Sequence, residues 1–199
     1  MRFRRMIASI IDLIILRFVF SLVLSIIPLN SKIKTNYAKL DEIEKSVASY
    51  DDLSEEDLDK MDEILYETEH EFVKYYLISS VVLIGYFILI PKYKKDQTFG
   101  QKIMKIRLVS DSKITTNIYV LRALLNSGLS LVLINPLLLY ILNRVWYSNI
   151  ASILLITQVL YWLISFVIFL ATKETIHDKI TKTKIIEVKR WENLQNKNK

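Results

Sequence analysis

The sequence predicts an all-α integral membrane protein with four transmembrane helices, an acidic extracytoplasmic helical hairpin and small cytoplasmic β-like segments. Hydrophobic residues make up 52% of the chain and are collected into blocks. A helix needs about 20 apolar residues to cross a hydrocarbon core of about 30 Å. We expect a single membrane domain over residues 1–190 and a disordered tail over 191–199. Four apolar runs approach or exceed the required length: residues 7–29, 72–90, 118–142 and 150–172.

The charged residues are divided unevenly among the segments between these runs. Residues 1–6, 92–117 and 173–199 hold eighteen Lys or Arg against six Asp or Glu, whereas residues 30–71 hold fourteen acids and five lysines. Short cytoplasmic loops collect Lys and Arg, so we expect both termini to be cytoplasmic. The net charge of +6 then indicates contact with anionic lipids of the inner leaflet and no nucleic acid partner.

The acidic segment 30–71 has the pattern of a helical hairpin. Ser54 followed by Asp57 resembles a capping box, so a helix is expected to start there and to continue into the second span. The turn is expected at 49–53. The acids favour a solvated amphipathic surface, although they could also attract cations to the mouth of a site. Apolar residues repeat at helical spacing in two groups: Leu40, Ile43 and Val47, then Leu58, Met61 and Leu65.

The basic inner segments contain two short stretches with the pattern of strands. Residues 104–108 alternate apolar and charged side chains, which is typical of a strand. Residues 184–188 form a second candidate after the last span. We expect the two stretches to pair beneath the membrane, with a turn at 111–113 leading the chain back to the third helix.

Several kinds of chemistry are excluded by composition or lack a motif. The chain has no cysteine, which excludes disulfides, thiolate catalysis and sulfur-ligated metals. It has no glycine-rich phosphate loop, nucleophile elbow or paired-histidine helix motif. Glu67, His70 and Glu71 share a helical face but have no further ligand in view. We therefore expect no enzyme, no cofactor and no metal site.

Asp12 is the most informative residue because it lies inside the first apolar run. A carboxylate at membrane depth costs roughly 2.5–3.5 kcal/mol on insertion scales, so it usually faces a protein interior, a cavity or a cation. Arg5 lies on the same helical face but about 10 Å away along the axis. Asp12 therefore needs a proton or a partner from another helix, and we expect Arg122 to be its counter-ion.

Two interpretations of this cluster stay open. In the first, Asp12 carries a proton or cation in a polar cavity. In the second, Asp12 and Arg122 form an ion pair that fixes the helix register. For His177 and Asp178, we expect an interfacial clamp at the inner end of the fourth helix, where Asp178 could meet Arg5 or the basic segment 102–107. The cavity of the first interpretation would be lined by Arg122, Asn126, Ser127 and Ser130, with Gln158 nearby.

Three stretches of the chain together resemble the RDD family of small bacterial integral membrane proteins. The first runs from Arg5 through Ala8 to Asp12. The second begins with Thr98 and Gly100 and continues into a strand-like segment, with Gln101 where lysine is usual and Lys105 where glycine is common. The third is the stretch 177–186, which holds the histidine–aspartate pair His177 and Asp178 and a later threonine.

The resemblance implies a multi-pass protein of the bacterial cell membrane whose expected role is transport, with some family members associated with sodium or proton exchange. It implies no enzyme. Arg5, Asp12 and Asp178 are carried over as functional residues, with Arg122 as a fourth. Four spans are few for alternating access, so a transporter of this size is expected to form a homo-oligomer or a membrane complex.

Overall fold

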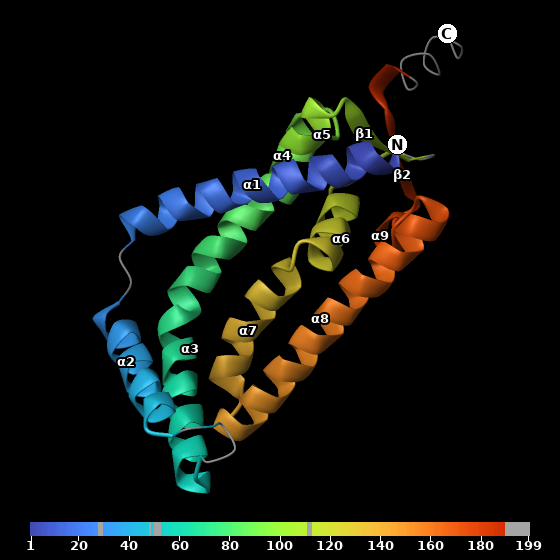
Figure 1. Ribbon diagram of the computed structural model, residues 1–199. Coiled ribbons are helices and arrows are strands. Elements are labelled where there is room, and N and C mark those ends of the chain that lie inside the picture. Colours follow the sequence, from blue (N-terminus) through green and yellow to red (C-terminus); the bar gives the residue numbers. More distant parts are fainter. Residues whose placement is uncertain (28–29, 48, 50–52, 111–112, 190–199) are drawn as a thin grey trace.

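The computed structural model describes residues 1–27, 30–47, 49, 53–110 and 113–189. Its secondary structure is mainly helical, with one pair of strands (Figure 1). The elements in chain order are α1 (Arg2–Ile26), α2 (Ser31–Lys45), α3 (Glu55–Ile84), the π-helix η2 (Gly85–Leu89), α4 (Ile90–Tyr93), α5 (Phe99–Ile103), β1 (Ile106–Ser110), α6 (Thr116–Asn126), α7 (Leu129–Ile141), α8 (Arg144–Thr172), α9 (Ile176–Ile180) and β2 (Thr183–Glu187).

Helix α1 runs across the bundle rather than along it. Figure 1 shows α3, α7 and α8 running in broadly similar directions, while α1 crosses them at the end that also carries α5, α9 and both strands. The N-terminus lies at this end. The arrangement places the first turns of α1 beside the end of α8, and the later turns of α1 lead away toward α2.

In the part of the chain that the structure describes, three helical segments are long and apolar enough to span a membrane. They are Arg2–Ile26, Glu55–Tyr93 and Arg144–Thr172, and the bent pair α6 and α7 could supply a fourth span. The expected spans at 7–29, 72–90 and 150–172 thus fall within or largely within longer helices. These helices extend past the apolar runs because helix formation needs backbone hydrogen bonds, not a particular hydropathy.

The third expected span is not one straight helix. Helices α6 and α7 differ in direction by 75° across a short break. Gly128 sits in the break with φ of 73°, a left-handed conformation that glycine adopts at little cost. The Ser127 hydroxyl donates to the Ala123 carbonyl oxygen, within the last turn of α6. The prediction of a continuous helix over 118–142 was therefore wrong at this position.

The acidic segment forms the expected pair of helices, α2 and the first half of α3. Ser54 begins α3 by accepting a hydrogen bond from the Asp57 amide, as the capping pattern predicts. The Asn36 side chain donates to the Thr68 hydroxyl at 3.0 Å between the two helices. Ile33 is only 1% exposed, so α2 is packed against α3 rather than detached. The expected turn at 49–53 lies largely outside the described residues.

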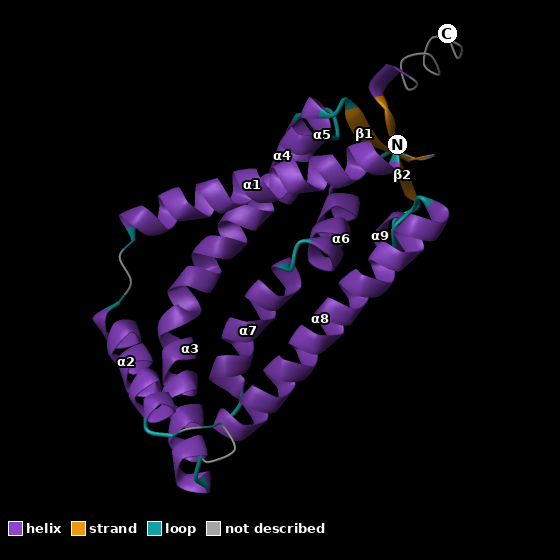
Figure 2. Ribbon diagram, in the orientation of Figure 1, coloured by secondary structure: helices purple, strands orange, loops and turns teal. Residues whose placement is uncertain are grey.

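The two strands form the predicted antiparallel pair (Figure 2). Ile106 pairs with Glu187 and Ser110 with Thr183. The first strand begins two residues later than expected because Lys105 has φ of 54° and turns the chain after α5. The expected turn at 111–113 lies mostly outside the described residues, as does the whole tail 191–199.

A buried cluster of apolar side chains lies at the same end as the strands. It joins residues from α1, α3, the π-helix, the strand β1, α6 and α7, all of which are buried. Its central members are Leu16, Leu83, Tyr86, Ile88, Leu108, Tyr119, Ala123 and Leu129. This cluster fixes the middle of α1, at Leu16, against the elements that carry the remaining site residues.

Candidate functional site: a carboxylate and an ion cluster beside an intramembrane cavity

Asp12 is buried on α1 and accepts hydrogen bonds from neutral groups. Asp12 is only 8% exposed. The Tyr86 hydroxyl donates to Oδ1 at 2.5 Å, the Thr98 hydroxyl donates to Oδ2 at 2.7 Å, and the Gly100 amide donates to Oδ1 at 2.7 Å. The carboxylate therefore joins α1 to the π-helix and to α5 without an opposite charge.

The start of α5 explains why threonine and glycine occur at these two positions. Thr98 caps α5, because its hydroxyl accepts from the Gln101 amide while the Gln101 side chain accepts from the Thr98 amide. This capping box leaves the Thr98 proton for Asp12. A Cβ on Gly100 would lie 2.1 Å from the Ala8 carbonyl oxygen and 2.8 Å from Asp12 Oδ1. Only glycine lets α5 approach α1 this closely.

Arg122 is not the counter-ion of Asp12, which corrects the sequence-based expectation. Its Nη1 donates to Asp178 Oδ1 at 2.7 Å and to the Thr183 hydroxyl at 2.6 Å. The reason is positional: α6 packs against α9, so the guanidinium reaches the carboxylate on α9. The structure brings Asp12 and Arg122 to the same cavity but does not pair them.

Asp178 binds both arginines of the site. Arg5 Nη2 donates to Asp178 Oδ2 at 2.5 Å, and Arg5 Nη1 donates to the Lys173 carbonyl oxygen at 2.7 Å. Asp178 is 1% exposed and also caps α9 through the Thr175 amide. The expected clamp between Arg5 and Asp178 is thus present in the structure, and Arg122 extends it to a third element.

The same cluster shifts the pKa values of two side chains on α9, the Asp178 carboxyl group and the His177 imidazole. Burial by itself raises the pKa of Asp178, but Arg122 and Arg5 outweigh it and hold that pKa well below its usual value. Burial, followed by the nearby Arg122 charge, lowers the pKa of His177 to about 3. At neutral pH the cluster therefore contains two cations, one carboxylate and a neutral imidazole.

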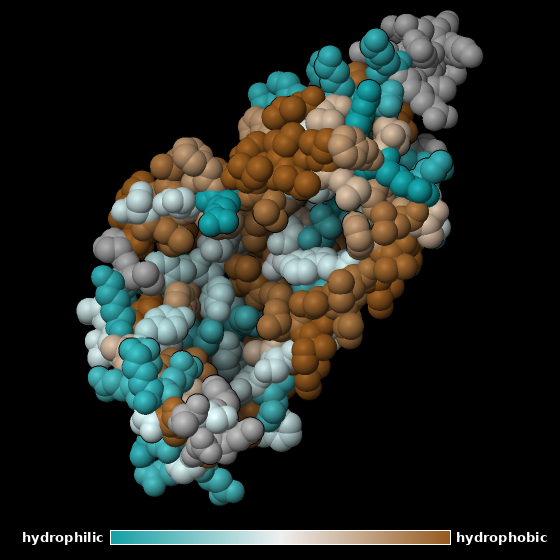
Figure 3. All heavy atoms as spheres, viewed as in Figure 1, coloured by the Kyte–Doolittle hydropathy of each residue, from teal (hydrophilic) through white to brown (hydrophobic). Residues whose placement is uncertain are grey.

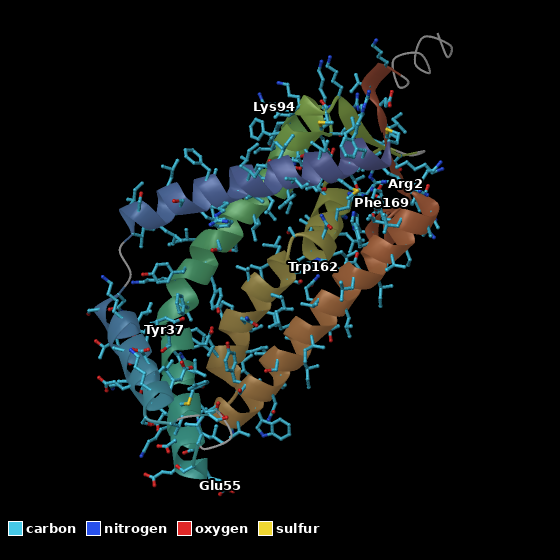
Figure 4. All side chains as sticks on the ribbon, in the orientation of Figure 1. Arg2, Tyr37, Glu55, Lys94, Trp162 and Phe169 are labelled. Atoms are coloured by element: carbon cyan, nitrogen blue, oxygen red, sulfur yellow. The ribbon has the colours of Figure 1, made fainter. Side chains whose placement is uncertain are left out.

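Arg5 also attaches the start of α1 to the end of α8. Its guanidinium lies 4.9 Å from the centre of the Phe169 ring, within the range of a cation–π contact. Nearby, Arg2 donates to the Ala171 carbonyl oxygen at 3.1 Å. Figure 4 labels Arg2 and Phe169 at this junction, with Trp162 further along α8. The two helices diverge from this point.

A cavity of about 670 Å³ occupies the space between the diverging helices. Asp12 and Arg122 both line it, together with Asn126 and apolar side chains of α1 and α8. Figure 3 shows mainly hydrophobic surface over α1 and α8 and paler, more polar residues in the hollow between them. Its size falls in the range of roughly 300–1,000 Å³ typical of small-molecule sites.

Ser130 does not line this cavity, contrary to the sequence-based expectation, whereas Arg122, Asn126 and Ser127 do. Gln158, which was expected nearby, contacts Ser130. The Ser130 hydroxyl donates to Gln158 Oε1 at 3.2 Å, and Gln158 Nε2 donates to the Leu125 carbonyl oxygen at 3.3 Å. The two side chains satisfy each other and the end of α6 at the break before α7. Their arrangement connects α6, α7 and α8 instead of forming a polar wall.

Tyr86 is the site residue that sequence reasoning missed. No role was expected for Tyr86 from the sequence, because tyrosines are common in the interfacial aromatic belts of membrane proteins. It is in fact 5% exposed and donates to Asp12. A tyrosine in the middle of an apolar run is the signal that could have singled it out, because a buried hydroxyl needs a partner.

The apolar helices and this site indicate a multi-pass membrane protein with a buried carboxylate beside a cavity between its helices. The chain belongs to the RDD family, whose family model matches residues 2–182. A comparison with curated proteins and another with solved structures each found no significant match. Within the described residues, no group of three or more potential His, Cys, Asp or Glu ligands could hold a metal ion.

Proposed function

We propose that this protein transports a proton or a small cation across the membrane, with Asp12 as the group that binds and releases it. The observation that carries the proposal is the contrast between two buried carboxylates. Asp178 lies between two arginines. Asp12 has neutral hydrogen-bond donors and no ion pair among the described residues, yet it lines a large cavity.

The two carboxylates would lose different interactions on accepting a positive charge. Protonating Asp178 would leave two buried guanidiniums without their counter-ion, which is costly. Protonating Asp12 would weaken the three hydrogen bonds that its carboxylate accepts, but it would leave no cation without a counter-ion. A buried ionisable group without a counter-ion is a functional candidate by default in a membrane protein. The adjoining cavity offers a route by which an ion can reach it.

Flux into liposomes tests this proposal. The purified protein is reconstituted, and pH-driven and sodium-driven ion movement is compared for wild type, Asp12→Asn and Asp62→Asn, the last an exposed acid on α3 that serves as control. We expect flux in wild type and in the control and none in Asp12→Asn, with all three proteins equally inserted and folded. Equal flux in all three would remove Asp12 from the mechanism.

A second candidate function is a non-transporting scaffold or accessory subunit. The buried Arg5, Asp178 and Arg122 cluster favours it, because such a cluster can hold α1, α6 and α9 in one arrangement without moving ions. Absence of flux from every protein in the liposome experiment, including wild type, would favour this role. Loss of thermal stability in Asp12→Asn alone would then identify Asp12 as a structural connection between α1 and α5.

The proposal includes the membrane placement and assembly expected from the sequence. The end that carries β1, β2 and α9 is proposed to face the bacterial cytoplasm, which the basic residues of segments 92–117 and 173–199 support. A homo-oligomer or membrane complex is proposed because few spans are available for alternating access. No catalytic step is part of the proposed function.

A further inference from the structure

We propose that the cavity between α1 and α8 binds one anionic phospholipid, with its phosphate against Arg122 and its acyl chain along the apolar wall. This inference concerns a ligand that the proposed transport does not require, so it stands whether or not Asp12 carries an ion. It rests on the charge of the ion cluster, on the unused donors that face the cavity, and on the composition of the cavity wall.

The charge of the cluster favours an anion. Arg5 and Arg122 carry two positive charges, and Asp178 supplies one negative charge between them. Asp12 lies about two helical turns, roughly 10 Å, from Arg5 along α1, and its oxygens are engaged by the π-helix and α5. The cluster of Arg5, Arg122 and Asp178 therefore has one excess positive charge, which a phosphate would balance. Asp96, the other acid that lines the cavity, is already paired with Arg107.

Hydrogen-bond donors remain for such an anion. A guanidinium has five N–H donors, and every hydrogen bond from Arg122 to the described residues starts from Nη1. Its Nη2 and Nε make none of these bonds, and Arg122 lines the cavity. His177 also lines the cavity; it is 6% exposed, and its Nδ1 is buried without a partner among the described residues. The unused Arg122 nitrogens supply the donors of this polar end of the cavity, and the neutral His177 imidazole lies beside them with Nδ1 unpaired among the described residues.

The remaining wall suits an acyl chain. Leu13 of α1 and Trp162 and Phe166 of α8 line the cavity, and they are 68%, 39% and 47% exposed. Side chains that are exposed on membrane-spanning helices face lipid, so the cavity is continuous with the surface that the bilayer covers. Figure 4 shows Trp162 on the same helix as Phe169, which marks the polar end.

A phospholipid fits these observations better than a free anion. A small ion would use only the arginine end and would make no contact with the apolar length of the cavity, so its binding would gain nothing from apolar burial. The arginine end also lies at the end of the bundle that carries the basic segments 92–107 and 173–189, where headgroups of anionic lipids are favoured. One ligand with a charged head and an apolar chain satisfies both ends at once.

Quenching of Trp162 by brominated lipids tests the proposal. Trp146→Phe and Trp191→Phe leave Trp162 as the reporter, and the protein is reconstituted with brominated phosphatidylglycerol or brominated phosphatidylcholine in an unbrominated zwitterionic bilayer. We expect a preference for the anionic lipid on the order of tenfold, since a hydrogen bond to a charged group contributes about that factor or more. Arg122→Gln should reduce the preference to about one, while Arg4→Gln, at an exposed arginine, should retain it.

Each alternative outcome has a defined meaning. If Arg122→Gln does not fold, Ser9→Leu replaces it, because Ser9 is an exposed cavity residue and leucine would fill the space while both arginines stay. Equal quenching by the two lipids in the single-tryptophan parent, or a preference that survives Arg122→Gln or Ser9→Leu, overturns the proposal. Loss of the preference in excess inorganic phosphate also overturns it, because the site would then bind a free anion.

Discussion

Replacement of Gly100 by alanine should separate α5 from α1 and release Asp12. An alanine Cβ at this position would lie 2.1 Å from the Ala8 carbonyl oxygen, whereas real contacts of this kind stay above 3.0 Å. The obstacle is a backbone oxygen, so no rotamer change can relieve it. The two segments must move apart by about 0.9 Å, the difference between these two distances.

This displacement is large enough to break a hydrogen bond. The Gly100 amide lies 2.7 Å from Asp12 Oδ1, and an added 0.9 Å would exceed the usual limit of about 3.2 Å for such bonds. A hydrogen bond to a charged group contributes about 1.5–3 kcal/mol, and overpacking costs about 1–3 kcal/mol. We therefore expect Gly100→Ala to lower the free energy of unfolding by about 3–5 kcal/mol.

Thermal unfolding of the purified protein in detergent measures the effect. A chain of this length loses about 2–4 °C in Tm for each kcal/mol, so the expected decrease is roughly 6–20 °C. Gly85→Ala is the matched control, because a Cβ there meets no atom within 4 Å. Alanine is also favoured over glycine in helices by up to about 1 kcal/mol. Equal Tm values for the two variants would refute the close approach of α5 to α1.

Three further predictions concern the partners of the two carboxylates. Asp178→Asn should lower the free energy of unfolding by about 3–5 kcal/mol, because two buried guanidiniums lose their counter-ion. The pKa of the Asp178 carboxyl group is lowered in the folded protein, so the stability that this group contributes is present above about pH 4 and is lost as pH falls further. The pKa of His177 is lowered to about 3, so the unfolded chain binds a proton below about pH 6.5 that the folded protein does not. Stability should therefore fall by up to about 1.4 kcal/mol per pH unit from pH 6.5 toward 4.5, and His177→Gln should remove this dependence. Tyr86→Phe should cost about 1.5–3 kcal/mol by removing a donor to Asp12.

Thermal unfolding with matched variants checks these three predictions. Asp62→Asn and Tyr93→Phe change exposed residues and should stay within about 0.5 kcal/mol of wild type. His70→Gln changes the other histidine of the chain, which is exposed, and should leave the pH dependence intact. An unchanged pH profile in His177→Gln would contradict the buried neutral imidazole. Wild-type stability in Asp178→Asn or Tyr86→Phe would contradict the contact concerned.

Much of the fold could be predicted because membrane spans and caps are local properties of the chain. A run of apolar residues produces a helix in lipid whatever lies beside it, which is why α1, α3 and α8 follow the hydropathy pattern. Ser54 and Asp57 set the start of α3 in the same local way. The pairing of β1 with β2 was also predictable, because two strand-like stretches, 104–108 and 184–188, were expected on the same side of the membrane. The first strand nevertheless begins later than expected, after the turn at Lys105.

The partners in the site could not be predicted in the same way. Arg5, Asp12 and Asp178 were recognisable as a set from their resemblance to the RDD family, and the family model confirms that resemblance over residues 2–182. The chosen partner of Asp12 was nevertheless wrong. Arg122 was chosen because it enters the membrane at a depth similar to that of Asp12. Depth gives no information on whether Arg122 lies on the face of α6 that packs against α9. That information depends on the 75° bend after α6.

The sequence by itself determined the class of protein, the approximate spans and the residues that carry charge into the membrane. These follow from hydropathy and from the cost of burying charge, which act on each segment separately. Only the tertiary structure decided that Asp178 takes both arginines and that Asp12 takes Tyr86, Thr98 and Gly100. Hydrogen bonds and ion pairs form over about 3 Å, so their partners depend on how helices cross and where they bend, which no single segment of the chain specifies.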